Sequence, residues 1–226
     1  MRIARYLLAV AVSALVVAAM QSAVCQESKP TIRHHRIEEV VADDSSSPEV
    51  DQAEAAMQKN DFAGAESLLQ KAVAAKPNDY RAWSDLGYIY NATQRLPQAI
   101  DAYKKSVGAK PEVFESNLNL GLLLARQGDN GDAAKYLKAA MQLKPGSNPE
   151  EGLSRAWLAL GRVEESTDPQ QAAAAYTEAA KLNPISALPH LATASLLEKQ
   201  KNYDAAVHEY QTAAELDPKS PDAQTG

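Results

Sequence analysis

Residues 83–111 read WSDLGYIYNATQRLPQAIDAYKKSVGAKP, and this stretch decides the fold. Apolar residues recur every three or four positions in both of its halves. This spacing predicts two amphipathic helices, over 79–93 and 96–109, joined by a short turn. Pro97 falls in the first turn of the second helix, where a missing N–H is harmless. Pro111 closes that helix, since proline disfavours helical geometry in the residue before it.

The same hairpin recurs along the chain in one register. The closing prolines are Pro77, Pro111, Pro145, Pro184 and Pro218, at intervals of 34, 34, 39 and 34 residues. Three further columns keep this register, one of alanine, one of large apolar residues and one of small residues: Ala65, Ala99, Ala133, Ala172 and Ala206; Leu69, Tyr103, Leu137, Tyr176 and Tyr210; Ala72, Ser106, Ala140, Ala179 and Ala213. Such a period predicts an array of about five units, over residues 47–78, 79–112, 113–146, 147–185 and 186–219.

The residues from Trp83 to Tyr90, followed by Ala99, Tyr103 and Pro111, resemble the signature of the tetratricopeptide repeat, W-x2-L-G-x2-Y…A-x3-F…P. A tyrosine replaces the phenylalanine of that signature. The resemblance covers roughly residues 47–219 and is weakest in the leading helices of the first and last units, which face a neighbour on one side only. It implies an all-α solenoid, a right-handed superhelix of helix-turn-helix hairpins.

The fourth unit departs from the common period. The connection after its preceding proline is longer than in the other units and contains Asn148 and Pro149. Asparagine is a good N-cap and proline suits the first helical position, so we expect a helix that begins early, near Pro149. We also expect Asp168 to cap the second helix of this unit, which begins at Pro169.

The first 25 residues have the character of a secretory signal peptide. Arg2 and Arg5 precede an apolar run over residues 6–20. Two alternatives remain open: an uncleaved anchor, because residues 6–25 carry no charge, and lipidation of Cys25, the only cysteine. Each places the body outside the cytoplasm, in the periplasm or secreted, as expected of an exported protein of bacterial type. Residues 26–46 read as a flexible linker and residues 220–226 as a disordered tail.

Composition and motifs argue against chemistry or nucleic-acid binding. The net charge is −6, which does not suit a polyanionic ligand. The sequence contains no Gly-rich phosphate loop, no H-E-x-x-H and no G-x-S-x-G. We therefore expect no enzyme activity, cofactor, metal or small-molecule substrate. The run Arg33-His34-His35-Arg36 in the linker is a possible metal or anion contact, but a solvated basic patch explains it more simply.

The resemblance implies that the leading helices line the concave side of the array and bind an extended peptide or a partner helix there. Helical spacing places eight candidate contacts on that side, with Asp85, Leu158 and Leu191 beside them: Tyr88, Asn91, Asn119, Leu122, Arg126, Arg155, Arg162 and Ser195. The arginines suit acidic groups or a C-terminal carboxylate. The alternative is that they are solubilising charges, or partners of Glu115 and Glu165.

A sharper comparison within the family argues against one class of partner. Chaperone-binding members clamp two carboxylates with lysines, asparagines and an arginine. The matching places are Val50, Glu54, Asp85, Glu115 and Asn119, of which only Asn119 fits. We do not expect a receptor for chaperone tails.

The end of the array supplies a second hypothesis for function. Arrays of this kind usually finish with an extra helix over the last hairpin, and the residues after Pro218 are few and polar. We therefore expect Val207, Tyr210 and Ala214 to be partly uncovered. Either the natural chain continues, or a partner or a second copy covers them. In the last case the protein is a structural module that self-associates through its second helix of unit five.

Overall fold

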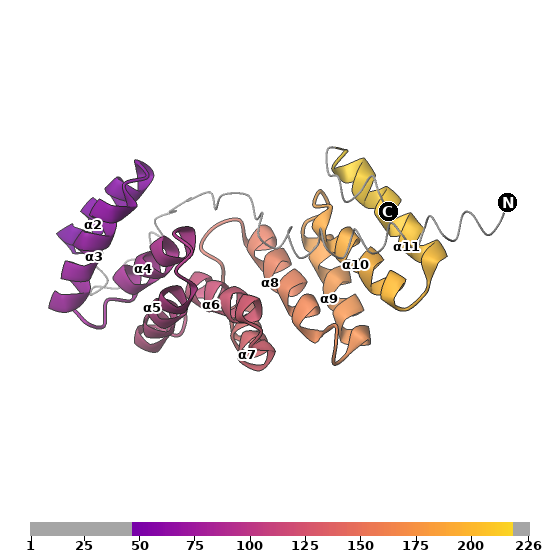
Figure 1. Cartoon of the computed structure of the whole chain (residues 1–226), viewed down its shortest axis with the longest axis horizontal. Coiled ribbons are helices and arrows are strands. Elements are labelled where there is room, and N and C mark those ends of the chain that lie inside the picture. Colours follow the sequence, from indigo (N-terminus) through magenta and orange to yellow (C-terminus); the bar gives the residue numbers. More distant parts are fainter. Residues whose placement is uncertain (1–46, 219–226) are drawn as a thin grey trace.

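The computed structural model describes residues 47–218, and all of their regular elements are α-helices (Figure 1). The predicted leader, linker and tail therefore lie outside the described residues. Ten helices form five consecutive hairpins: α2 (Pro48–Gln58) with α3 (Phe62–Ala75), α4 (Tyr80–Ala92) with α5 (Leu96–Ala109), α6 (Phe114–Gln127) with α7 (Asn130–Met141), α8 (Pro149–Glu164) with α9 (Pro169–Leu182), and α10 (Leu188–Lys199) with α11 (Tyr203–Leu216). No helix in this part of the chain is long and apolar enough to cross a membrane.

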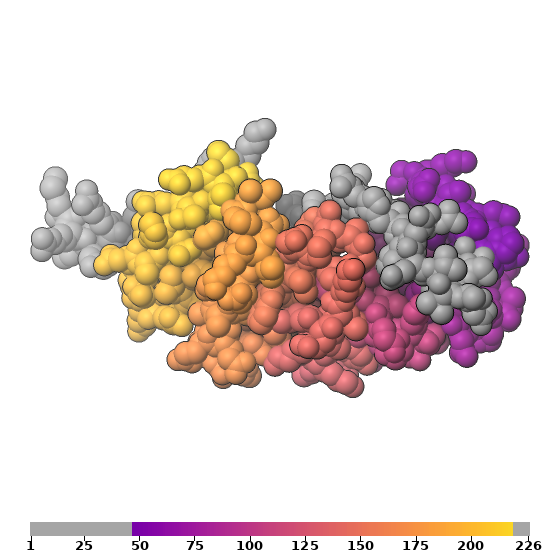
Figure 2. Space-filling model, turned by 180° about the vertical axis from the view of Figure 1, so that it is seen from behind, coloured from indigo at the N-terminus to yellow at the C-terminus, as the bar shows by residue number. Residues whose placement is uncertain are grey.

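The hairpins follow one another along the long axis of the molecule, with α2 at one end and α11 at the other (Figures 1 and 2). Each helix packs mainly against the helices before and after it in the chain. The leading helices of neighbouring hairpins also touch, α2 with α4, α6 with α8 and α8 with α10, and no two trailing helices do so to the same extent. Because alternate elements approach most closely on the inner side of a curved array, the leading helices line its concave face.

The columns found in the sequence form the core. Every member of the alanine column, of the large apolar column and of the small-residue column is buried. The one polar member, Ser106, has its hydroxyl 2.9 Å from the backbone oxygen of Tyr80 and 2.8 Å from the hydroxyl of Ser116. These bonds satisfy a buried polar group and tie α5 to both of its neighbours. The predicted solenoid is therefore confirmed.

The two helices of the second hairpin cross closely at Gly87. A Cβ atom on this residue would lie 2.8 Å from the ring of Tyr103, a contact that side chains essentially never make. Gly121 stands in the same relation to Leu137 in the next hairpin, again at 2.8 Å. Glycine is needed at these places because the facing residue of the trailing helix fills the space.

Aspartates begin four of the helices. The carboxylates of Asp61, Asp79, Asp129 and Asp168 accept hydrogen bonds from backbone N–H groups of the first turn of α3, α4, α7 and α9. The expected cap at Asp168 and the early start of α8 at Pro149 are thus confirmed. The expected cap at Asn148 is wrong in part: Asn148 stands at the N-cap position with a left-handed backbone (φ 44°), but its side chain accepts no hydrogen bond from a backbone N–H of α8. Its amide donates instead to Glu151 at 3.2 Å.

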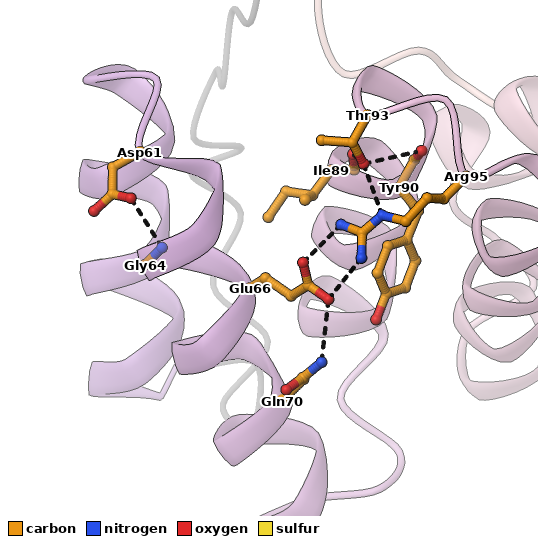
Figure 3. Close-up of polar contacts among 8 residues, drawn as sticks. All are labelled: Asp61, Gly64, Glu66, Gln70, Ile89, Tyr90, Thr93 and Arg95. Carbon is orange, nitrogen blue, oxygen red and sulfur yellow. Dashed lines mark hydrogen bonds and ion pairs between the residues drawn. The ribbon is translucent and has the colours of Figure 1, made fainter.

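A bidentate ion pair holds the first hairpin against the second (Figure 3). Arg95, in the turn after α4, donates to both carboxylate oxygens of Glu66 on α3, at 3.0 and 2.6 Å. Its guanidinium also lies over the ring of Tyr90, 4.5 Å from the centroid. The hydrogen bond from Arg95 holds the pKa of Glu66 below its ordinary value. Paired donors of this kind fix geometry as well as charge.

Candidate functional site

The eight candidate residues all lie on leading helices, as the sequence predicted. Tyr88 and Asn91 belong to α4, Asn119, Leu122 and Arg126 to α6, Arg155 and Arg162 to α8, and Ser195 to α10. The three arginines are exposed, and the other five residues are half-buried. The structure therefore places them in series on the leading helices, from the second hairpin to the fifth.

A polar cluster fills the concave face between α4, α6 and α8. At its centre is the hydroxyl of Tyr103, which reaches this face from the trailing helix α5 and accepts a hydrogen bond from Asn119 at 3.3 Å. Burial raises the pKa of Tyr103, and so do the charges of Asp85 and Tyr88, whereas the bond from Asn119 and the charge of Arg155 lower it. Four residues of the leading helices thus affect the pKa of one buried hydroxyl.

A second cluster, around Glu165, joins α8, α9 and α10. Tyr176, which occupies the place of Tyr103 two units further along the same column, donates its hydroxyl to Glu165 at 2.5 Å. The other carboxylate oxygen of Glu165 pairs with Lys199 at 2.6 Å. Burial first, then the bond and charge of Glu165, raise the pKa of Tyr176, while Arg162 lowers it. In the last hairpin, the hydroxyl of Tyr210 donates to Glu198 at 3.2 Å.

The sequence reasoning missed these tyrosine hydroxyls, because it counted the large apolar column only as core. The signal was present in that column, where three of five members are tyrosines with a polar end. A buried tyrosine hydroxyl seeks a partner. The ring lies in the hairpin core, and the hydroxyl bonds to a polar side chain on or just after a leading helix.

The three arginines of the candidate set differ from most of their neighbours in their ion pairing. Arg126, Arg155 and Arg162 form no ion pair with any residue of the described part of the chain. The carboxylates proposed as their alternative partners are engaged elsewhere: that of Glu115 accepts the backbone N–H of Gly146 at 2.8 Å, and Glu165 belongs to the cluster described above. Pairing with Glu115 or Glu165 therefore does not explain these arginines.

Asp85 is one of the buried residues of α4. The residue is 8% exposed, and its Oδ2 atom has no hydrogen-bond partner among the described residues. Burial raises the pKa of this carboxyl to about 8, with a further rise from Glu54 and Asp79 and an opposing effect of Arg81. The Oδ1 atom of Asn91, further along α4, is also buried without a partner.

The last hairpin carries the large exposed apolar residues of the described chain. They lie on α11 and around the start of α10: Ile185, Leu188, Tyr203, Val207 and Leu216. Val207 is 46% exposed, as expected, but the expectation for Tyr210 is wrong, since only 6% of it is exposed. Its ring belongs to the buried tyrosine column and packs between α10 and α11.

The chain is similar to known proteins over the same repeated segments. The sequence profile of the tetratricopeptide repeat family matches residues 50–113, 106–148 and 164–221. Tetratricopeptide repeat protein 5 of Bos taurus is 30% identical over 173 residues, which are 70% of this chain and 39% of that protein. This chain spans 10% to 40% of the lengths of the curated relatives it matches.

Solved structures give the same architecture. MamA has a TM-score of 0.66 at 24% identity, with coverage of 74% of this chain and 95% of MamA. YrrB, described as a TPR protein with an unusual peptide-binding site, has a TM-score of 0.68 at 18% identity, with coverage of 80% and 91%. At these identities the likeness shows the fold alone.

Proposed function

The chain belongs to the tetratricopeptide repeat family, and on that premise we propose that it is a scaffold that holds a peptide or a helix of a partner protein in its concave groove. Members of this family are typically interaction modules without catalytic activity. The peptide-binding site described for YrrB supports a peptide as the class of ligand. The groove is the concave face from α4 to α10.

The observation that carries this proposal is the set of unpaired arginines on α6 and α8. A row of cations on one face, next to carboxylates that already have partners, has no role in holding the hairpins together. Guanidinium groups bind carboxylates through two parallel hydrogen bonds, which gives both affinity and orientation. Arg126, Arg155 and Arg162 therefore suit acidic side chains or the C-terminal carboxylate of the partner.

A crosslinking pull-down from the native compartment tests the groove. The variant Arg126→Glu/Arg155→Glu/Arg162→Glu reverses the charge of the row, and we expect it to lose the partner. The matched control, Lys71→Glu/Lys104→Glu/Lys135→Glu, makes the same change in net charge at exposed positions of the trailing helices α3, α5 and α7. We expect the control to keep the partner. Equal recovery by the arginine variant and the wild-type chain removes these residues as contacts.

We also propose that the scaffold works outside the cytoplasm, in the cell envelope or the secreted space. The basic and then apolar character of residues 1–25 supports this. Mass spectrometry of the mature N-terminus from native cells distinguishes a cleaved leader, a retained anchor and a lipidated Cys25. A chain that begins at Met1 and fractionates with cytoplasmic proteins contradicts the proposal.

The apolar surface of the last hairpin favours a second candidate function, self-association. In the second hairpin the equivalent of Val207 is Ile100, which is 6% exposed and belongs to the same core cluster as Phe114 and Leu118 of the following leading helix. A second copy of the chain would cover Val207 in the same manner. Light scattering tests this: the mass rises with concentration for the wild-type chain and stays monomeric for Val207→Glu. A monomeric wild-type chain at every concentration discards this candidate.

A further inference from the structure

Asp85 lies in a position where the fold has no need of a carboxyl group. Counted along the repeat, the equivalent residues of the next three hairpins are Asn119, Ala159 and Ala192. Both alanines are buried at 7% exposure, so the packing of the leading helices is satisfied by a methyl group. A buried polar atom without a partner destabilises the fold, because it has lost its hydration and gained no bond in return. A residue that lowers the stability of the fold in this way is expected at a functional position.

The surroundings of Asp85 favour a positive ligand. Glu54 on α2 and Asp79 at the start of α4 add negative charge at the carboxyl, and Arg81 is the one cation whose field opposes them. Tyr103 on α5 is a further titratable group near it, since the charge of Asp85 raises the pKa of that hydroxyl. The second unpartnered atom on α4, Oδ1 of Asn91, is also an acceptor. The unpaired atom of Asn91 therefore requires a donor, and that of Asp85 requires one when the carboxyl is ionised.

We propose that Asp85 is the subsite of the groove that binds a lysine or arginine side chain of the partner. This inference rests on the proposed function of the groove. It adds that one end of the bound segment carries a basic residue. The residue is 8% exposed, and the proposal requires a rotation of its side chain that brings the carboxyl to the groove. A segment that lies along the concave face then carries a basic residue over α4 and acidic groups over α6 and α8.

Binding at this subsite transfers a proton to solvent. In the empty groove the carboxyl holds its proton at neutral pH, because its pKa is raised to about 8. An ammonium or guanidinium group favours the ionised form. The neutral carboxyl therefore loses its proton to the buffer and becomes the carboxylate of a new ion pair, while the ligand keeps its own charge. Binding below pH 8 releases protons, and this release is measurable by calorimetry in two buffers of different ionisation enthalpy.

An array of capped synthetic peptides, probed with the full chain, tests the subsite. Each peptide carries glutamates at one end and either lysine, arginine or the neutral isostere norleucine at the other. We expect the wild-type chain to prefer lysine or arginine over norleucine about tenfold, which is about 1.4 kcal/mol. Asp85→Asn should lose this preference and the proton release while it keeps the preference for glutamate. Asp85→Ala, which copies the alanines of the later hairpins, serves as the second variant, and circular dichroism confirms that both fold.

The possible failures are distinct. A wild-type chain that binds glutamate-containing peptides without regard to lysine or norleucine overturns the subsite and leaves the groove intact. Binding that depends on Asp85 but prefers an acidic residue at that place also overturns it, because the carboxyl then donates its proton to an anion. A chain that binds no peptide of the array, and whose arginine variant still recovers its partner, overturns the groove itself.

Discussion

The replacement of Asp85 by asparagine should stabilise the protein, and the gain should grow with pH. The folded carboxyl keeps its proton up to about pH 8, whereas an ordinary carboxyl loses it near 3.8. Between these values the folded state binds one more proton than the unfolded state. Stability contributed by the protonated form is therefore complete below pH 3.8 and is lost as the pH rises through 8. Asparagine keeps the shape of the side chain and does not titrate.

The size of the effect follows from the same interval. At about 1.4 kcal/mol per pKa unit, the interval sets a ceiling of about 6 kcal/mol. The ionised side chain recovers hydration when it rotates toward the groove, so we expect a gain of about 1–3 kcal/mol at pH 9 and less than half of this at pH 5. For a chain of this length the gain at pH 9 corresponds to a rise in the melting temperature of about 2–12 °C.

Urea and thermal unfolding at pH 5 and pH 9, followed by circular dichroism, measure this gain. Asp101→Asn, which removes an exposed carboxylate of α5 paired with Lys105 at 2.8 Å, is the matched control. We expect its effect on stability to be below about 0.5 kcal/mol and the same at both pH values. An Asp85→Asn variant whose stability gain does not differ between pH 5 and pH 9 would refute the reasoning, because the buried carboxyl would then not hold a proton.

The remaining predictions concern the packing of the array. Gly87→Leu should destabilise the protein by about 1–3 kcal/mol or prevent folding of the second hairpin, because the helices must move apart. Gly108→Ala, with nothing within 4 Å of the new Cβ, should instead stabilise the protein by up to about 1 kcal/mol. Urea unfolding measures both changes. Arg95→Met should cost about 1 kcal/mol and show its loss first in hydrogen exchange of α3, since the ion pair to that helix is removed. Tyr210→Glu should cost more than about 3 kcal/mol in thermal unfolding, whereas Val207→Glu should change stability by less than about 0.5 kcal/mol; equal costs would contradict the burial of the tyrosine.

The repeat period determines the fold almost completely, for a physical reason. Each hairpin must bury the same three columns against its neighbours, so one set of spacings places every helix. The predicted helix at 96–109 coincides with α5, and α8 begins at Pro149 as expected. The local detail at Asn148 was not predictable, because its side chain follows a left-handed backbone that the loop imposes.

The site could be predicted only in part. Helical spacing predicts that Arg126, Arg155 and Arg162 lie on the concave face, because the period of 3.6 residues fixes the side of a helix. It cannot show that Tyr103 of a trailing helix sends its hydroxyl between two leading helices, since that depends on the distance between hairpins. Nor can it show that Asp85 lacks a partner, because every nearby donor must first be placed in three dimensions.

Each of the five described hairpins packs only against the hairpins next to it, and this makes the array elastic. No contact of any extent joins hairpins that are not adjacent. A load applied at α2 and α11 is therefore carried through four junctions in series, each of which yields a little. We expect such a rod to lengthen or coil like a spring, so that a ligand spanning several hairpins sets the curvature of the whole.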